Sequence, residues 1–314
     1  MIRPNTFLIG VQKAGTSSLY NWISQHPDVC GPLSMKDIPF FIDDKMFVKG
    51  EEFLDRTYRH YYNNERLVLN GSAHSVFFPY AIKRIKEFDP KSKLILILRD
   101  PVERAISSYN FSVNRNFDED DILTSIHKED QRLNGDDLKM VMETTYINHG
   151  YYSKQIKNLF EIVKKEDVLI LFYDDLKNNP EHLMSETYSF LGLDDTFKPD
   201  FKLLNKTGTI RFKMLNRIIF NNSKWKSFIM KYFLNHLMPY DFKYRFKLFL
   251  KKITNKESST KTTNSTINVK NDAELKKHLF DFFVDEIIEL EQLINKDLSS
   301  WKKHGNNKLL EKVK

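Results

Sequence analysis

Residues 6–18, TFLIGVQKAGTSS, join two elements of different period. Residues 6–11 are apolar and largely β-branched, which is typical of a strand buried on both faces. Residues 18–23 carry apolar side chains at helical spacing. Between them, Gly10 and Gly15 permit a tight turn whose amide N–H groups converge, and the helix N-terminus adds a positive dipole. This stretch predicts an anion-binding turn between a strand and a helix.

Three further segments have the same apolar character. They are residues 93–98, residues 167–172 and, more weakly, residues 66–69, and helical stretches separate them. Strands without polar alternation, interspersed with helices, predict a parallel sheet that helices cover on both faces. We therefore expect an α/β protein with a P-loop-like three-layer fold, which binds its ligand beyond the carboxyl ends of the strands.

The composition is that of a soluble globular chain. The 314 residues are 41% hydrophobic and 29% charged, and 13% are aromatic, which excludes a disordered segment. No apolar run approaches the roughly 20 residues that span a bilayer, and no signal-peptide pattern precedes the first strand. Cys30 is the single cysteine, so an internal disulfide and a cysteine-based zinc site are excluded. We expect a reducing, cytoplasmic setting.

The net charge of +7 is concentrated in one segment. Residues 205–256 hold 13 Lys and Arg and one acid, which leaves 36 basic and 41 acidic residues elsewhere. Aromatic and basic residues alternate at helical spacing over residues 224–252. They indicate amphipathic helices packed on the domain, a peripheral contact with an anionic membrane, or the wall of an acceptor site for an acidic glycan. Nucleic acid is not expected as a partner, since no binding module accompanies the segment.

The chain divides into three parts along its length. We expect one domain over residues 1–254, which includes the basic amphipathic segment 205–254. Residues 255–272 form a Ser/Thr/Asn/Lys tract with few apolar side chains, which is typical of a polar linker. Residues 273–304 regain apolar side chains at helical spacing and predict a closing helix that packs on the same domain.

The predicted turn differs from the Walker loop of nucleotide triphosphatases. That loop ends in Gly-Lys-Ser/Thr, whereas here Thr16 follows Gly15 and the lysine, Lys13, lies inside the loop. A nucleotide-dependent kinase or NTPase, with Asp100 on magnesium after the strand 93–98, is one interpretation. Arg99 beside that aspartate argues against it. A turn that binds nothing is the remaining alternative.

Several motifs, in order, resemble those of the sulfotransferases that use 3′-phosphoadenosine 5′-phosphosulfate (PAPS). Residues 10–20, GVQKAGTSSLY, are similar to the family's 5′-phosphosulfate loop, and residues 96–109, LILRDPVERAISSY, to its 3′-phosphate motif. The second match is the more specific, because an Arg-x-Pro and a serine eight residues after that arginine must coincide. The resemblance covers roughly residues 5 to 200 and is nearest in motif to the heparan-sulfate-type and bacterial branch.

The resemblance implies sulfuryl transfer from PAPS, with release of PAP and without a metal. The nucleotide-binding residues that it implies are Lys13, Ala14, Gly15, Thr16, Ser17, Ser18, Arg99 and Ser107, with Lys206 and Arg211 added by position only. The chemistry agrees, since Arg99 can fork onto a phosphate while Ser107 donates a hydroxyl. Lys13 is placed to neutralise charge on the bridging oxygen as it develops. The alternative for Arg99 is an ion pair with Asp100 or Glu103 at the strand end.

Transfer to an alcohol or an amine also requires a base within reach of the acceptor. Residues 35–41, MKDIPFF, resemble the Lys-Glu-x-x-Phe-Phe motif of the heparan-sulfate-type branch, in which the glutamate is the base. Asp37 stands in place of that glutamate, and Lys36 is implied to orient the sulfuryl group or the acceptor. His74, in NGSAHS at residues 70–75, is the rival base. The expected acceptor is a glycan or a small-molecule natural product, and a PAP-binding, membrane-peripheral protein without transfer activity is the non-enzymatic alternative.

Overall fold

The computed structural model describes residues 1–202 and 272–305. The basic segment 205–254 with Lys206 and Arg211, and the linker up to residue 271, lie outside the described residues. The strands are β1 (Thr6–Gly10), β2 (Val29–Cys30), β3 (Leu67–Gly71), β4 (Lys93–Leu98) and β5 (Val168–Phe172). The α-helices are α1 (Thr16–Ile23), α2 (Asp44–Phe47), α3 (Glu51–Tyr58), α4 (Pro79–Phe88), α5 (Pro101–Asn114), α6 (Ile122–His127), α7 (Glu129–Leu133), α8 (Leu138–Thr144), α9 (Tyr152–Ile162), α10 (Tyr173–Asn178), α11 (Pro180–Leu191) and α16 (Ala273–Ile294). The 3₁₀ helices are η1 (Leu33–Met35), η2 (Ser75–Phe77), η3 (Asn148–Gly150), η4 (Lys165–Asp167) and η7 (Ser299–His304).

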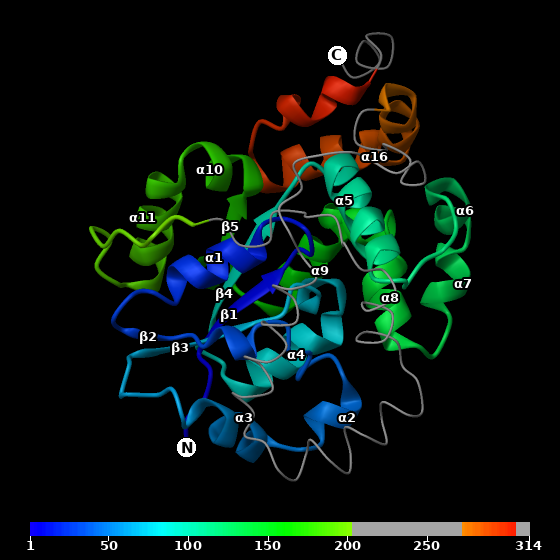
Figure 1. Cartoon of the computed structure of the whole chain (residues 1–314). Helices are drawn as coiled ribbons and strands as arrows, with labels where there is room; N and C mark the ends of the chain where they lie inside the picture. Colours follow the sequence, from blue (N-terminus) through cyan, green and yellow to red (C-terminus); the bar gives the residue numbers. More distant parts are fainter. Residues whose placement is uncertain (203–271, 306–314) are drawn as a thin grey trace, which may run out of the picture.

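The described strands form one parallel sheet in the order β2-β3-β1-β4-β5. β1 lies at its centre, where Thr6 is opposite Leu69 of β3 and Lys93 of β4. All five residues of β1 are buried, as their lack of polar alternation predicts. The predicted fold class, a parallel sheet flanked by helices in three layers, is confirmed (Figure 1).

Helices cover both faces of this sheet. On one face α1 packs against α11, which also contacts α10, and on the other α4 packs against α9 (Figure 1). The connection that follows β1 runs in the direction of β3, and the connection that follows β4 runs in the opposite direction, to β5. Right-handed connections that run in opposite directions place their helices on opposite faces of the sheet. The direction of the connections reverses between β1 and β4. The loops that follow these two strands therefore meet at the topological switch point, where open α/β sheets bind their ligands.

The C-terminal part differs in one respect from the single helix predicted over residues 273–304. Helix α16 ends at Ile294, and Asn295 follows with a left-handed φ of 50°. The 3₁₀ helix η7 then carries Trp301, whose Nε1 donates to Asp174 Oδ2 at 3.3 Å. Asparagine tolerates the left-handed conformation better than most residues, so Asn295 ends the helix within an otherwise continuous helical pattern.

Helix α16 lies against α9 and α5. Its apolar face buries Leu279, Phe283 and Ile287 almost completely. Near the middle of the helix the buried carboxylate of Glu286 accepts hydrogen bonds from the backbone N–H of Ser153, at 2.6 Å, and from its hydroxyl, at 2.7 Å. These contacts attach the C-terminal element to the first turn of α9, next to the sheet edge that bears the predicted site.

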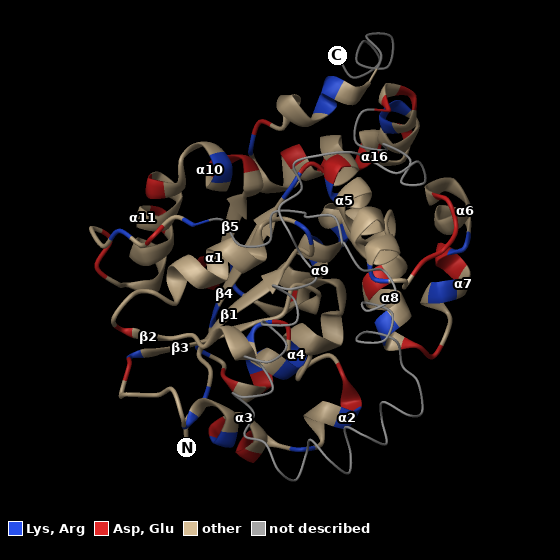
Figure 2. Cartoon of the chain, viewed as in Figure 1, with Lys and Arg blue, Asp and Glu red and all other residues tan. Residues whose placement is uncertain are grey.

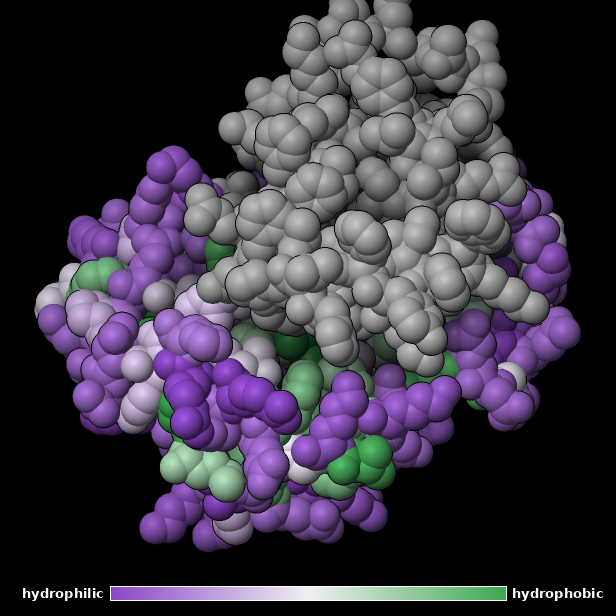
Figure 3. Space-filling model, turned by 60° about the horizontal axis from the view of Figure 1, so that its bottom comes forward, coloured by the Kyte–Doolittle hydropathy of each residue, from purple (hydrophilic) through white to green (hydrophobic). Residues whose placement is uncertain are grey.

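The surface of the described residues is mainly polar. Acidic and basic residues are interspersed over the outer helices (Figure 2). Of the described residues visible in Figure 3, most are hydrophilic, and hydrophobic residues form small patches. Within residues 1–202 and 272–305, no helix has both the length and the apolar character needed to cross a membrane.

Candidate functional site

The turn after β1 has the backbone geometry of an anion site. Lys13 and Gly15 adopt positive φ angles of 71° and 87°. Gly15 is the N-cap of α1, and a Cβ at this position would meet Tyr173 Cδ2 at 3.0 Å. Within the described part of the chain, the amide N–H groups of Gly15, Thr16 and Ser17 have no acceptor. These donors converge at a helix N-terminus, which favours a bound anion.

Two other residues of the predicted set use their amides inside the turn. The N–H of Ala14 donates to the carbonyl of Val11 at 3.2 Å, and the N–H of Ser18 donates to the carbonyl of Gly15 at 3.0 Å. Ala14 is completely buried. In this structure both residues hold the shape of the loop.

The structure brings Arg99, at the end of β4, onto the same turn. Its Nη1 donates to the carbonyl oxygen of Lys13 at 3.0 Å, and its guanidinium lies 4.7 Å from the centre of the Tyr173 ring. The alternative ion pair with Glu103 exists only at 3.8 Å, and Glu103 has a closer partner in Lys276, at 2.6 Å. Among the described residues, most of the Arg99 donors therefore have no closer partner and are available to a ligand.

The serines of α5 have different environments. Ser107 is half-buried, and its hydroxyl has no hydrogen-bond partner among residues 1–202 and 272–305. Ser108 is buried, and its hydroxyl donates to Gln12 Oε1 at 2.7 Å. The predicted phosphate ligand Ser107 is thus the serine with an unused hydroxyl, whereas Ser108 ties α5 to the turn after β1.

Cations dominate the electrostatics around Lys13. Burial, followed by the charges of Arg115 and Arg99, lowers the pKa of Lys13 to about 8. Its Nζ lies 4.3 Å from the centre of the Phe111 ring. A ligand with two anionic groups would relieve this repulsion, because each negative charge favours the protonated lysine. The turn, its unused donors and the cation excess all fit PAPS, which carries a phosphosulfate and a 3′-phosphate.

Two charged residues near Lys13 were not predicted from the sequence. Glu143 Oε2 accepts a hydrogen bond from Gln12 Nε2 at 2.9 Å, and burial raises the pKa of this carboxyl. Arg115 follows the last residue of α5, and burial lowers its pKa. Neither residue belongs to a sequence motif. Both reach Lys13 through the packing of α5 and α8, so no signal in the sequence marks them.

The predicted acceptor-side residues lie at the neighbouring end of β3. The backbone of Lys36 pairs with that of Gly71 in an isolated parallel β-bridge, and the N–H of Asp37 donates to the carbonyl of Gly71 at 2.6 Å. Lys36 Nζ contacts Asp37 Oδ2 at 2.5 Å; the lysine side chain is 9% exposed and the aspartate side chain 54%. Asp37 and Lys36 both act on the pKa of His74, and Lys36 acts on that of Lys13. Each of the four predicted catalytic residues therefore lies within electrostatic range of at least one other.

His74 is linked to a second histidine that the sequence analysis missed. Its Nδ1 lies 3.4 Å from Nε2 of His149, which is buried and stacks on Phe77 with ring centres 3.8 Å apart. Within residues 1–202 and 272–305, no group of three or more His, Cys, Asp or Glu side chains is arranged to hold a metal ion.

Comparison with known proteins identifies a common domain. The sulfotransferase domain family matches residues 3–235. The chain is 34% identical over 112 residues to the membrane-associated sulfotransferase kil1 of Dictyostelium discoideum, which is 35% of this chain and 23% of that protein. It is 25% identical over 209 residues to heparan sulfate glucosamine 3-O-sulfotransferase 3B1 of Homo sapiens, which is 65% of this chain and 50% of that protein. The chain thus spans half or less of the length of these relatives.

A solved structure shares the fold. The crystal structure of a sulfotransferase from Alicyclobacillus acidocaldarius matches with a TM-score of 0.65 at 22% identity, over 96% of this chain and 100% of that chain. The similarity extends over the sheet and its helices and agrees with the three-layer architecture described above.

Proposed function

Because this chain belongs to the sulfotransferase domain family, we propose that it moves a sulfuryl group from PAPS to a hydroxyl or an amine and releases PAP. The observation that carries the proposal is the contact between two cation-bearing turns. Arg99 Nη1, after β4, donates to the backbone carbonyl oxygen of Lys13, after β1, at 3.0 Å. This contact lies at the switch point of the sheet. One turn offers a cradle for a 5′-phosphosulfate, and Arg99 with Ser107 offers a cradle for a 3′-phosphate.

PAPS supplies the sulfuryl group, and the side chains supply charge and proton transfer. The acceptor oxygen or nitrogen forms its bond to sulfur as the bond from sulfur to the bridging oxygen breaks, in line. Lys13, whose pKa is about 8, is mostly protonated at neutral pH and stabilises the charge left on the bridging oxygen. Lys36 is positioned to orient the sulfuryl oxygens or the acceptor. The acceptor's proton passes to a base on the same side.

Two side chains compete for the role of base. Asp37 is the motif residue, but its carboxylate contacts Lys36 at 2.5 Å and is more than half exposed. His74 is less exposed, and burial lowers its pKa to about 4, so its ring is neutral at physiological pH. Asp37 contacts Lys36 directly, and the charges of both residues affect the pKa of His74.

We assign the acceptor to the class of glycans and small-molecule natural products. Support comes from the curated relatives whose names contain heparan sulfate, and from the mixed charges of Lys36, Asp37, Arg115 and Glu143 near Lys13. Such a lining suits a polar, hydroxyl-rich acceptor, because each hydrogen-bonding group of the acceptor finds a partner.

The test measures transfer from PAPS to an acceptor panel and, separately, PAP binding by calorimetry. Lys13→Ala and Arg99→Ala are expected to lower turnover by at least about 10²-fold, since each removes charge stabilisation. Arg99→Ala is also expected to weaken PAP binding. Lys198→Ala, whose ion pair with Glu181 lies on the surface, serves as the control. Near-wild-type turnover of both site variants, or magnesium-dependent ATP hydrolysis with no affinity for PAP, contradicts the proposal.

A further inference from the structure

His74 is the last member of a row of three polar side chains. Thr145 Oγ1 lies 2.6 Å from His149 Nδ1, and His149 Nε2 lies 3.4 Å from His74 Nδ1. Thr145 and His149 are 1% and 3% exposed. No residue of this row other than His74 belongs to the site that the sequence motifs outline.

The position of one proton follows from Thr145. Its hydroxyl also lies 2.7 Å from the carbonyl oxygen of Val141, one turn earlier. No described residue outside α8 donates a backbone N–H to that carbonyl, and a buried carbonyl without a donor costs about 1–3 kcal/mol. The hydroxyl has a single proton, which we place on Val141. Thr145 Oγ1 is then an acceptor for His149, and His149 Nδ1 is the donor.

The proton on His149 Nδ1 determines which nitrogen of His74 is protonated. A neutral imidazole has one donor and one acceptor nitrogen, so a proton on His149 Nδ1 leaves its Nε2 as an acceptor. His74 Nδ1 is the group that faces this acceptor and carries the next proton. We propose, on the basis of the sulfotransferase function above, that Thr145 and His149 are positioning residues that hold His74 as its Nδ1–H tautomer, with the Nε2 lone pair left to take the acceptor's proton.

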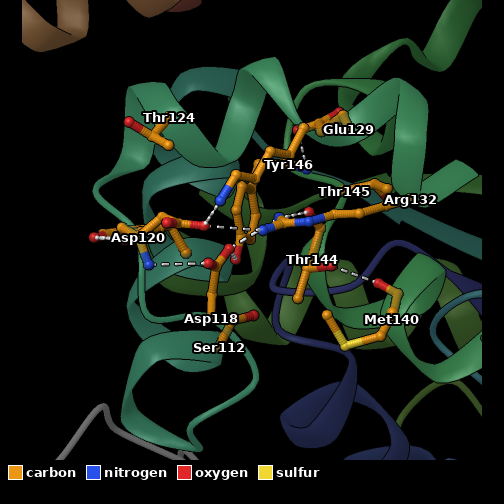
Figure 4. A network of polar contacts seen from close by, with 12 residues as sticks. Ser112, Asp118, Asp120, Thr124, Glu129, Arg132, Met140, Thr144, Thr145 and Tyr146 are labelled. Atoms are coloured by element: carbon orange, nitrogen blue, oxygen red, sulfur yellow. Dashed lines mark hydrogen bonds and ion pairs between the residues drawn. The ribbon is translucent and has the colours of Figure 1, made fainter.

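The backbone that carries Thr145 and His149 is fixed by a buried carboxylate. Glu129, which is 2% exposed, accepts from the N–H of Ile147 at 2.7 Å and from the N–H of Asn148 at 3.1 Å. Figure 4 shows Thr145 in the polar network of this region, where Tyr146 and Arg132 both reach Asp118. A row of side chains on a backbone fixed in this way keeps its geometry while an acceptor binds.

The charges around His74 keep both rings neutral. Burial lowers the pKa of His74, the cations Lys36 and Arg104 act in the same direction, and Asp37 opposes them. Burial together with His74 and Arg104 places the pKa of His149 well below its ordinary value. A neutral ring has one donor and one acceptor nitrogen, as the row of Thr145, His149 and His74 requires. Each ring therefore keeps one tautomer over the physiological pH range.

The first experiment reads the tautomers directly and requires no acceptor. Long-range ¹H–¹⁵N spectra of the full chain, labelled in its histidine rings, distinguish protonated from unprotonated ring nitrogens. We expect His74 and His149 both to be protonated at Nδ1. Thr145→Val removes the hydroxyl oxygen that accepts from His149 at nearly constant volume, leaves the Thr145 backbone in place, and is expected to move the His74 proton to Nε2. Thr145→Ser retains the hydroxyl and is expected to retain the wild-type spectrum.

The second experiment measures turnover and PAP affinity of the same pair of variants. We expect Thr145→Val to lower kcat by about 10²-fold, the lower end of general-base effects, with PAP affinity unchanged, and Thr145→Ser to restore kcat. Equal kcat in the two variants overturns the proposal. A wild-type spectrum with His74 protonated at Nε2 overturns it too, even if Thr145→Val does not fold. If the wild type has no affinity for PAP, the proposed function is contradicted, but the tautomer result is unaffected.

Discussion

At the scale of single residues, Lys13 couples the site to pH. Its pKa of about 8 in the ligand-free protein reflects burial beside Arg115 and Arg99, and a bound anion raises that pKa. PAP affinity is therefore expected to be highest below pH 8 and to fall as the pH rises through 8 toward the pKa of the bound state. Calorimetry between pH 7 and about pH 10 tests this expectation and should detect proton uptake on binding.

The matched control for this prediction is Lys13→Arg. A guanidinium stays charged over the whole range, so PAP affinity of the variant is expected to be nearly flat between pH 7 and about pH 10. An equal decline in both proteins contradicts the assignment and places the titrating group elsewhere.

Gly15 gives a second prediction at this scale. An alanine at φ 87° pays backbone strain, and its Cβ also meets Tyr173 at 3.0 Å. Gly50 has φ 68° and ψ −178° with no atom within 4 Å of the added Cβ, so Gly50→Ala measures the strain of a positive φ without a steric clash, in a different conformation from that of Gly15. We expect each variant to lose about 1–2 kcal/mol of unfolding free energy in urea, and Gly15→Ala alone to lose PAP affinity. Unchanged PAP binding in Gly15→Ala excludes this turn as the phosphosulfate cradle.

At the scale of elements, Glu286 joins α16 to α9. Two donors of Ser153 are buried against its carboxylate, so Glu286→Ala is expected to lower the free energy of unfolding by about 2–3 kcal/mol. The neighbouring Glu289 pairs with Lys157, and the two side chains are 47% and 52% exposed; Glu289 Oε2 lies 3.2 Å from the Ser153 hydroxyl, farther than Glu286 Oε2 at 2.7 Å. Glu289→Ala is expected to cost less than about 1 kcal/mol. Equal losses in urea unfolding contradict the role given to Glu286.

At the scale of the whole molecule, a ligand that binds at the switch point stabilises the entire sheet. PAP at about 100 times its Kd is expected to add about 2.7 kcal/mol to the unfolding free energy. This gain should appear as a higher Tm in the wild type and be smaller in Arg99→Ala at the same PAP concentration. Stabilisation by magnesium-ATP and not by PAP indicates the kinase or NTPase interpretation.

Much of the local structure was predictable because short-range physics sets it. The apolar run of β4 has the predicted bounds, Lys93–Leu98, and β1 differs from its prediction by one residue, Val11. The glycine-bearing turn needed only its own residues to be identified. In contrast β2, of two residues, is too short to show a periodicity, and a left-handed Asn295 interrupts a helical pattern that continues beyond it.

The composition of the site was only partly predictable, for a different physical reason. Motif residues such as Lys13 and Arg99 lie at strand ends, and a parallel sheet brings strand ends together whatever the details of packing. Glu143, Arg115 and His149 lie on helices and loops inserted between β4 and β5, and they reach the site only through the way these elements pack. Their roles depend on contacts between residues far apart in the chain, so the folded structure alone reveals them.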